Sequence, residues 1–180
     1  MRALFLSLTL LFGLVTNGVA LEPKQILEWP SAEVEKALPS SYPMAYYLYS
    51  ARLAHEGDKE RALFWYYIGE LRYRFYLAVN PDLSPDGAPA LFGSLHQSVG
   101  QSVADPKQID RATSIKEFKQ ALDWDAANEN KVTSKRVHHK AWLTVRANLT
   151  DELEMTDDIK QTTRRPQHKR RFSSTNDPTS

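Results

Sequence analysis

The sequence predicts an all-α protein, a single helical bundle of about five or six helices around one central aromatic-rich helix. Apolar residues recur at three- and four-residue spacing over most of the chain, and breaks rich in Gly and Pro separate these segments. Residues 58–79 are the most aromatic segment, with seven aromatic residues in 22, against 11% in the whole chain. A helix that is apolar nearly all round is usually buried, so we expect this segment to lie at the centre.

The composition fits one domain with extensions and excludes several kinds of site. The chain has 180 residues, of which 42% are hydrophobic and 25% charged, as in ordinary globular proteins. It has no cysteine, which excludes a disulfide, a thiolate metal site, a cysteine nucleophile and an acylated cysteine anchor. The formal net charge is +1, and it falls to zero if Arg2 is removed with a leader. We therefore expect no nucleic-acid partner.

Residues 1–20 have the pattern of a cleaved secretory signal peptide. Arg2 gives a positive start, an apolar run follows from Ala3 to Val15, and Gly18 and Ala20 are small residues before the expected cleavage site. The alternative is a membrane anchor, but a spanning helix needs roughly 20 apolar residues. We expect an exported, periplasmic protein without a transmembrane segment after cleavage.

Residues 21–41 are predicted to form an N-terminal arm ahead of the helical domain, which we place at 42–161. Ser31 is a candidate N-cap for a short helix over Ala32–Leu38. The apolar residues of this arm that we expect to dock on the domain are Ile26, Leu27 and Trp29.

The first two long helices are predicted at Tyr42–Glu56 and Asp58–Val79. Gly57 is a natural C-terminal stop, and Asp58 is a good N-cap for the second helix. Gly69 lies in the middle of that helix, where it costs about 1 kcal/mol relative to alanine. We therefore expect a close contact with the preceding helix at Gly69. The exposed side of the central helix is predicted at Glu70, Arg72 and Arg74.

Three further helices are predicted in the second half of the chain. Residues 80–88 form a turn-rich connector, and Pro89 starts a helix that we expect Gly100–Pro106 to break. An amphipathic helix follows at Ile109–Asn128, and Ser134 caps a last helix at Lys135–Gln161. Residues 162–180 contain too few apolar groups to offset the entropy of ordering, so we expect a disordered basic tail.

One pair of helices carries a resemblance. The run Tyr46–Arg72 has a glycine at its turn, Gly57, followed by Ala62, Trp65 and Tyr66. It resembles one helix-turn-helix unit of the Sel1-like branch of tetratricopeptide repeats, which implies a protein-binding helical hairpin. A solenoid needs about three repeats. No second copy is visible, so we interpret the match as a paired-helix packing solution.

A longer segment, 64–101, also looks like a group of exported bacterial proteins of unassigned function. This resemblance implies a bacterial origin and no particular activity.

The aromatic and arginine side chains of the central helix are the candidate interaction surface for a peptide or glycan. Tyr, Trp and Arg are enriched at interfaces. The alternative is that the rings fill the core, where each hydroxyl or indole needs one polar contact. The candidate residues are Trp65, Tyr66, Arg72, Tyr73, Arg74 and Tyr76.

The tail is a candidate polyanion-binding segment. In an exported protein the available polyanions are envelope lipids and glycans, and each basic residue near an anionic membrane adds about 1 kcal/mol. The alternatives are a solvated tail, or a tail that folds back on the acidic stretch Asp151–Asp158. The candidate residues are Arg164, Arg165, Lys169, Arg170 and Arg171.

No catalytic, cofactor-binding or metal motif is recognisable in the sequence. The run Asp123–Asn130 lacks the glycine and the glutamate that an EF-hand loop needs at its sixth and twelfth positions. His138 and His139 are adjacent, so on a helix they point about 100° apart and cannot chelate one ion. His55 and His96 are expected at the solvent or the edge of the core. Nucleophile motifs and Gly-rich phosphate loops are also missing.

These observations favour an exported, non-enzymatic interaction protein of the bacterial envelope. Two alternatives stay open. One is a periplasmic inhibitor or immunity-type protein. The other is a small envelope hydrolase whose site assembles from residues distant in the sequence, as catalytic triads do.

Overall fold

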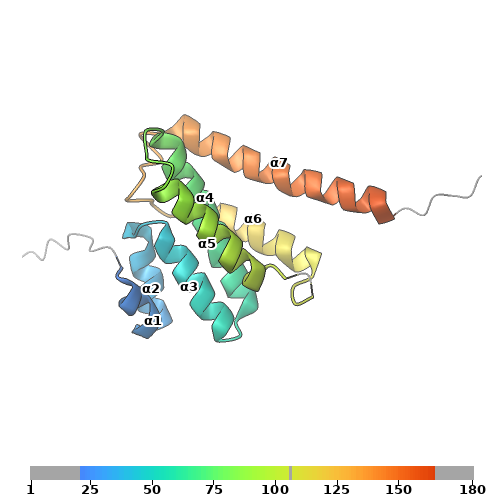
Figure 1. The fold of residues 1–180 in the computed structure, drawn as a ribbon, viewed down its shortest axis with the longest axis horizontal. Helices are drawn as coiled ribbons and strands as arrows, with labels where there is room; N and C mark the ends of the chain where they lie inside the picture. Colours follow the sequence, from blue (N-terminus) through green and yellow to red (C-terminus); the bar gives the residue numbers. More distant parts are fainter. Residues whose placement is uncertain (1–20, 106, 165–180) are drawn as a thin grey trace, which may run out of the picture.

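The computed structural model describes residues 21–105 and 107–164, with side chains as far as Met155. Over these residues the chain is helical and contains no strand (Figure 1), which confirms the all-α prediction. The predicted signal peptide, 1–20, and residues 165–180 of the predicted tail lie outside this range. The elements are α1 (Pro23–Glu28), α2 (Ser31–Ala37), a 3-10 turn η1 (Leu38–Ser40), α3 (Met44–His55), α4 (Lys59–Val79), α5 (Ala88–Val103), α6 (Arg111–Ala127) and α7 (His139–Arg164).

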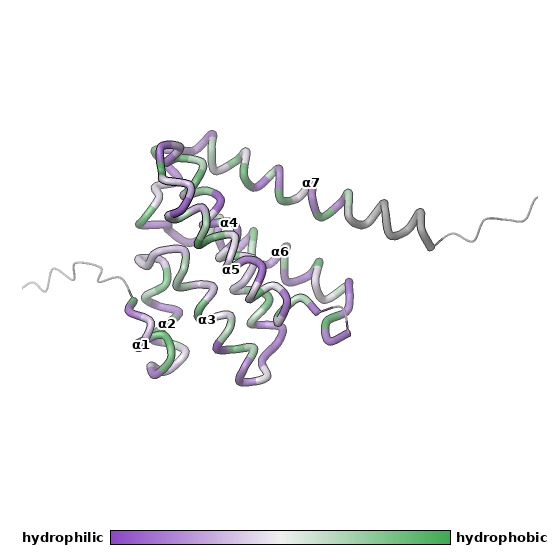
Figure 2. The backbone as a smooth tube through the Cα atoms, in the orientation of Figure 1, coloured by the Kyte–Doolittle hydropathy of each residue, from purple (hydrophilic) through white to green (hydrophobic). Residues whose placement is uncertain are grey.

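The central position of α4 is confirmed. It packs against α3, α5, α6 and α7, whereas α1 packs on α3. Figure 1 shows α7 lying along one edge of the molecule, away from α1 and α2. Figure 2 shows hydrophobic and hydrophilic residues interleaved along the helices, as helices with a buried and an exposed face require. In the described part of the chain, no helix combines the length and the apolarity needed to cross a membrane.

The turn between α3 and α4 forms as predicted. Gly57 has a φ of 87°, a left-handed conformation that glycine adopts without a steric penalty. The carboxylate of Asp58 then accepts a hydrogen bond from the backbone N–H of Arg61 (3.4 Å) and one from its guanidinium (2.8 Å). These two residues reverse the chain and set the α3–α4 hairpin.

The close helix contact at Gly69 is also confirmed. A Cβ added to Gly69 would lie 3.1 Å from the Cβ of Tyr46 and 3.3 Å from ring atoms of Tyr47. Both tyrosines are fully buried on α3. The missing side chain therefore lets α4 approach α3 at the point where two buried tyrosines of α3 lie.

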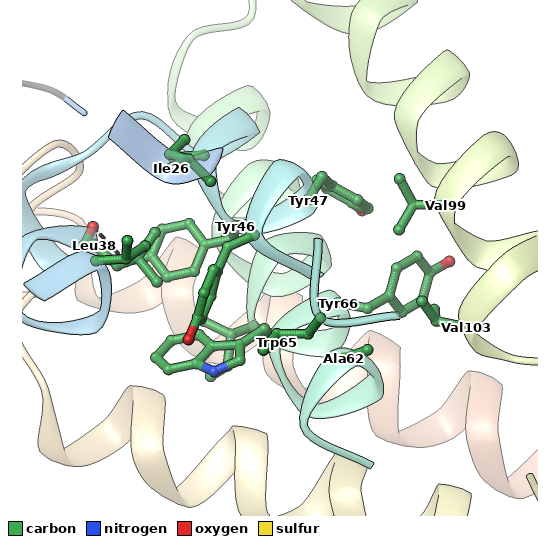
Figure 3. Close-up of a cluster of buried hydrophobic side chains, with 14 of the residues drawn as sticks. Ile26, Leu38, Tyr46, Tyr47, Ala62, Trp65, Tyr66, Val99 and Val103 are labelled. Carbon is green, nitrogen blue, oxygen red and sulfur yellow. Dashed lines mark hydrogen bonds between the residues drawn. The ribbon is translucent and has the colours of Figure 1, made fainter. Parts of the chain in front are cut away.

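Aromatic rings of α3 and α4 lie in the core, as the alternative interpretation of the central helix expected. Figure 3 shows the rings of α3 and α4 meeting Ile26 and Leu38 from the N-terminal arm and Val99 and Val103 from α5. The ring of Trp65 packs edge-on against Tyr49, with centroids 5.7 Å apart. The Tyr46 hydroxyl donates to the Leu38 carbonyl at 2.7 Å, so the buried ring keeps its polar contact.

The N-terminal arm docks differently from the prediction. Ile26 is fully buried, but Leu27 and Trp29 are 64% and 38% exposed, so the expectation that they dock was wrong. Residues 23–28 form α1. The guanidinium of Arg52 donates to backbone carbonyls at the C-terminal end of this helix, those of Ile26 (2.9 Å) and Trp29 (2.7 Å). Ser31 is the first residue of α2 rather than its N-cap, a position taken by Pro30.

Gly100 does not end α5, contrary to the prediction. The helix continues to Val103, which is buried, and Gly100 lies inside it. A Cβ on Gly100 would come within 2.8 Å of the Tyr66 hydroxyl. Glycine at this position therefore allows α5 to lie against α4, and its role is packing rather than helix termination.

The last helix begins four residues later than predicted. Ser134 caps a turn, in which its hydroxyl accepts from the Val137 N–H at 3.3 Å, and α7 starts at His139. The intervening Lys135 instead donates from Nζ to the Asn128 carbonyl (2.6 Å) at the end of α6. This contact holds the 134–138 turn against α6.

Candidate interaction groove

A surface groove runs beside the contact between α4 and α7. The helices meet where Val145 and Leu149 of α7 pack with Leu71 of α4 and Phe118 of α6. Next to this contact the groove is lined by Arg74, Leu77, Ala78, Val145 and Asn148. The groove continues over the start of α7 and the preceding turn, and this part has a volume of about 520 Å³. It is also lined by Val137, His138, His139, Lys140, Ala141 and Thr144.

The lining of the groove combines an apolar floor with a basic rim. Ala78, Ala141 and Val145 offer small apolar surfaces, whereas His138 and Lys140 stand at the rim with exposed side chains. The residues that line this end include no Asp or Glu, and the chain from Lys131 to Thr150 contains none either. This end of the groove therefore favours an acidic ligand.

Arg74 forms the charged floor at the other end of the groove. Its guanidinium donates to Glu70 of α4 at 2.7 Å and to the two carboxylate oxygens of Glu152 of α7 at 2.9 and 3.0 Å. Partial burial by itself lowers the pKa of Arg74, but the carboxylates of Glu70 and Glu152 outweigh this and raise it. Arg74 is thus a fixed cation that joins α4 to α7.

A polar cluster lies next to Glu70 on the α5 side. Nδ1 of His96 lies 2.9 Å from the hydroxyl of Tyr66 and 3.3 Å from that of Tyr47. Burial raises the pKa of both tyrosines well above the ordinary value, and the carboxylate of Glu70 adds to this shift. Both hydroxyls therefore stay protonated at physiological pH and serve as hydrogen-bond partners of the imidazole.

The cluster around His96 has part of the composition of an acid–base site without its geometry. The carboxylate of Glu70 lies 3.9 Å from His96 Nδ1, beyond hydrogen-bond distance, and already accepts from Arg74. Among the described residues the side-chain hydrogen-bond partners of His96 are Tyr47 and Tyr66, and neither has the lowered pKa of an activated nucleophile. His55 is exposed at the end of α3.

The described residues contain no group of three or more His, Asp or Glu side chains placed to hold a metal ion. Of the acids in the rejected calcium motif, Asp123 is exposed and Asp125 is fully buried, so they do not share one site.

Four of the six predicted surface residues on the central helix are buried. Trp65, Tyr66, Tyr73 and Arg72 are covered by the neighbouring helices, so assigning them to an interaction surface was wrong. The remaining two, Arg74 and Tyr76, are partly exposed. Arg74 belongs to the groove described above, and Tyr76 contacts the exposed ring of Tyr42. Of the three residues predicted on the exposed side of α4, Glu70 and Arg72 are buried and Arg74 is partly exposed.

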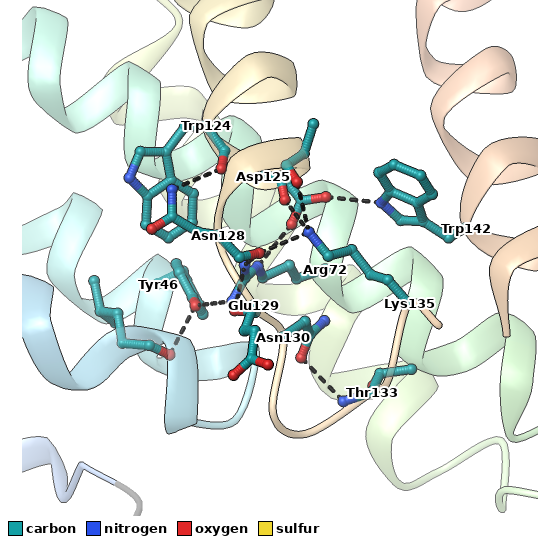
Figure 4. A network of polar contacts seen from close by, with 12 residues as sticks. Tyr46, Arg72, Trp124, Asp125, Asn128, Glu129, Asn130, Thr133, Lys135 and Trp142 are labelled. Carbon is teal, nitrogen blue, oxygen red and sulfur yellow. Dashed lines mark hydrogen bonds and ion pairs between the residues drawn. The ribbon is translucent and has the colours of Figure 1, made fainter. Parts of the chain in front are cut away.

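Arg72 is the centre of a buried polar network that the sequence interpretation missed (Figure 4). Its side chain is 1% exposed and its Nε donates to Asp125 Oδ1 of α6 at 2.9 Å. Its Nη1 donates to the Tyr46 hydroxyl of α3. The other carboxylate oxygen of Asp125 accepts from the Trp142 indole of α7 at 2.8 Å. The network links α3, α4, α6 and α7.

Helix periodicity contains a sequence signal that points to this network. Asp125 follows Phe118 by seven residues and Ala121 by four, so it shares their buried face. An acid on a buried face needs a buried cation or donor. Arg72, on a helix that is apolar nearly all round, is the matching residue.

The predicted polyanion-binding residues fall at the edge of the described part of the chain or outside it. Arg164 is the last residue of α7, and its side chain lies beyond the described ones. Arg165, Lys169, Arg170 and Arg171 lie outside the described residues. The role of the tail therefore stays a prediction.

Comparisons of the chain with protein-family models, with curated proteins and with solved structures found no match. The likeness of Tyr46–Arg72 to a Sel1-like hairpin therefore stays a resemblance.

Proposed function

We propose that this protein is an exported, non-enzymatic interaction protein of the bacterial envelope, which binds a protein partner in the α4–α7 groove. The observation that carries the proposal is the groove itself, with an apolar floor at Ala78 and Val145 and a basic rim at His138 and Lys140. An apolar centre with a polar rim is the usual anatomy of a protein interface. The signal-peptide pattern of residues 1–20 supports export.

The basic rim of the groove supports recognition of an acidic partner. His138 and Lys140 lie at this end and no Asp or Glu is among its lining residues, whereas Arg74 at the other end is already paired with Glu70 and Glu152. A periplasmic inhibitor or immunity-type protein would use the same groove, with an enzyme or toxin as its partner. The tail adds a second, weaker contact with anionic envelope components.

A capture experiment with groove variants tests this proposal. The full chain, affinity-tagged after Ser180, is produced in a Gram-negative host and used to capture proteins from envelope extract. Ala78→Arg fills the groove floor, and we expect it to reduce capture of the partner at least about tenfold. Gln101→Arg, an exposed change on α5, is the matched control and should leave capture unchanged.

Equal capture by Ala78→Arg and the unchanged protein, with both folded by circular dichroism, would contradict the assignment of the groove. The same preparation tests export. The protein should be recovered from the periplasm with Leu21 as its first residue, whereas an intact Met1 on cytoplasmic protein would contradict the export proposal.

A further inference from the structure

One face of α7 borders the whole groove and has a regular, self-repeating spacing. Its residues are separated alternately by four and three positions, the spacing that keeps side chains on one face of a packed helix. The members of this groove face are Val137, in the turn that leads into α7, and Ala141, Thr144, Asn148, Asp151 and Met155 of α7. The first four line the groove, and the outermost two, Val137 and Met155, are 68% and 58% exposed.

The charges along this helix are separated into two blocks. The segment from Lys131 to Thr150 contains Lys and Arg residues and no acid, whereas Asp151–Asp158 contains five acids and no base. Lys140 lies at the basic end of the groove, and Glu152 is held at the acidic end by Arg74. The surface of α7 beside the groove face is thus basic at one end and acidic at the other.

Such a surface is complementary to itself when it is turned by a two-fold rotation. If two α7 helices lie antiparallel about a midpoint near Arg146, Val137 faces Met155 of the second copy, and Lys140 faces Glu152 of the second copy. Thr144 faces Asn148, which allows polar contacts between short side chains at the centre. Antiparallel packing also sets opposite ends of the two helix dipoles side by side, which is favourable. Each pair occurs twice in an isologous interface.

We propose that the occupant of the groove is a second copy of this chain, whose α7 packs antiparallel against the first to form a two-fold dimer. This inference rests on the proposed function of the groove as a protein-binding site. It is favoured over an unrelated partner because one chain supplies both the exposed apolar ends and both charge blocks. In the dimer, the flexible Met155 side chain of one copy enters the groove beside Val137 and Ala78 of the other.

Complementary charge variants provide the test. Lys140→Glu places two acids opposite each other at both ends of a homodimer, and Glu152→Lys places two lysines there. We expect each variant alone to weaken dimerisation at least about tenfold, because like charges then meet at both ends. An equimolar mixture of the two variants restores opposite charges at both ends, so the mixture should form heterodimers as readily as the unchanged protein.

The measurement is sedimentation velocity of the full mature chain up to about 1 mM, at low and high salt, since screening should weaken the association. Glu154→Lys, an exposed change of the same charge off the groove face, is the matched control and should dimerise normally. Circular dichroism checks that each variant is folded, which matters because Glu152 also pairs with Arg74.

Two outcomes would overturn the inference. One is an unchanged protein that stays monomeric at every concentration, and the other is a mixture that gains no dimer over its separate components. A monomer that still captures an envelope protein in an Ala78-dependent way would overturn the second copy as the occupant and leave the proposed function standing. A monomer without Ala78-dependent capture would overturn both.

Discussion

Gly69 shows how a single residue without a side chain fixes a helix pair. Its missing Cβ would lie 3.1 Å from the Cβ of Tyr46, closer than side chains normally pack. We predict that Gly69→Leu lowers the free energy of unfolding by about 1–3 kcal/mol through overpacking of the α3–α4 contact. Urea denaturation followed by far-UV circular dichroism measures this change.

Gly93 is the matched control for this substitution. It also lies within a helix, but a Cβ there would have no neighbour within 4 Å. Gly93→Ala should raise the free energy of unfolding by up to about 1 kcal/mol, because alanine is the better helix former. An unchanged stability of Gly69→Leu would show that α3 and α4 can separate at little cost, contrary to the packing described.

At the scale of helices, the ion pair of Arg72 and Asp125 determines how α4 and α6 are joined. Both side chains are 1% exposed, and Tyr46 and Trp142 complete their hydrogen bonds from α3 and α7. We predict that Asp125→Ala lowers the free energy of unfolding by about 3–5 kcal/mol, because it leaves a buried guanidinium without its counter-charge. Thermal and urea unfolding, monitored by circular dichroism, measure the loss.

Asp123→Ala is the control for this loss, since Asp123 lies on the same helix and is exposed. It should change the free energy of unfolding by no more than about 0.5 kcal/mol. The double variant Arg72→Met with Asp125→Leu should recover most of the stability, because a well-packed apolar pair can replace a buried ion pair. If Asp125→Ala were as mild as Asp123→Ala, the network would not hold the helices together.

For the whole molecule, the aromatic core predicts a specific response to alkaline pH. Seven of the eight tyrosines have a raised pKa, mostly because they are buried, and that of Tyr49 reaches about 12. An unfolded tyrosine ionises near pH 10. Above about pH 10 the folded protein therefore holds more protons than the unfolded chain, and its stability falls as the pH rises. Below pH 10 this contribution to stability is fully present.

We expect tyrosinate absorbance at 295 nm to appear together with the loss of helical circular dichroism, in one steep transition above pH 10. The same protein unfolded in urea is the control and should titrate gradually near pH 10. A gradual titration near pH 10 with the helices intact would mean that the rings are accessible to solvent, against the buried positions of Tyr46 and Tyr47.

Most of the fold follows from patterns that are local in the sequence. Helical periodicity, the glycine at position 57 and the N-cap at Asp58 depend on residues a few positions apart, so they could be recognised without knowledge of the neighbours. The dominance of one aromatic segment identified α4 as the central helix for the same reason. The close contact at Gly69 could be inferred because a glycine inside a helix needs a compensating gain.

The tertiary structure alone decided what each polar or small residue does on that scaffold. Arg72 and Arg74 are two residues apart on one helix, yet one is buried against Asp125 and the other lies in the groove, because different helices cover the two positions. Gly100 packs against Tyr66 instead of ending α5, and α7 leaves a groove beside α4. These outcomes depend on contacts between distant segments, which helical periodicity does not encode.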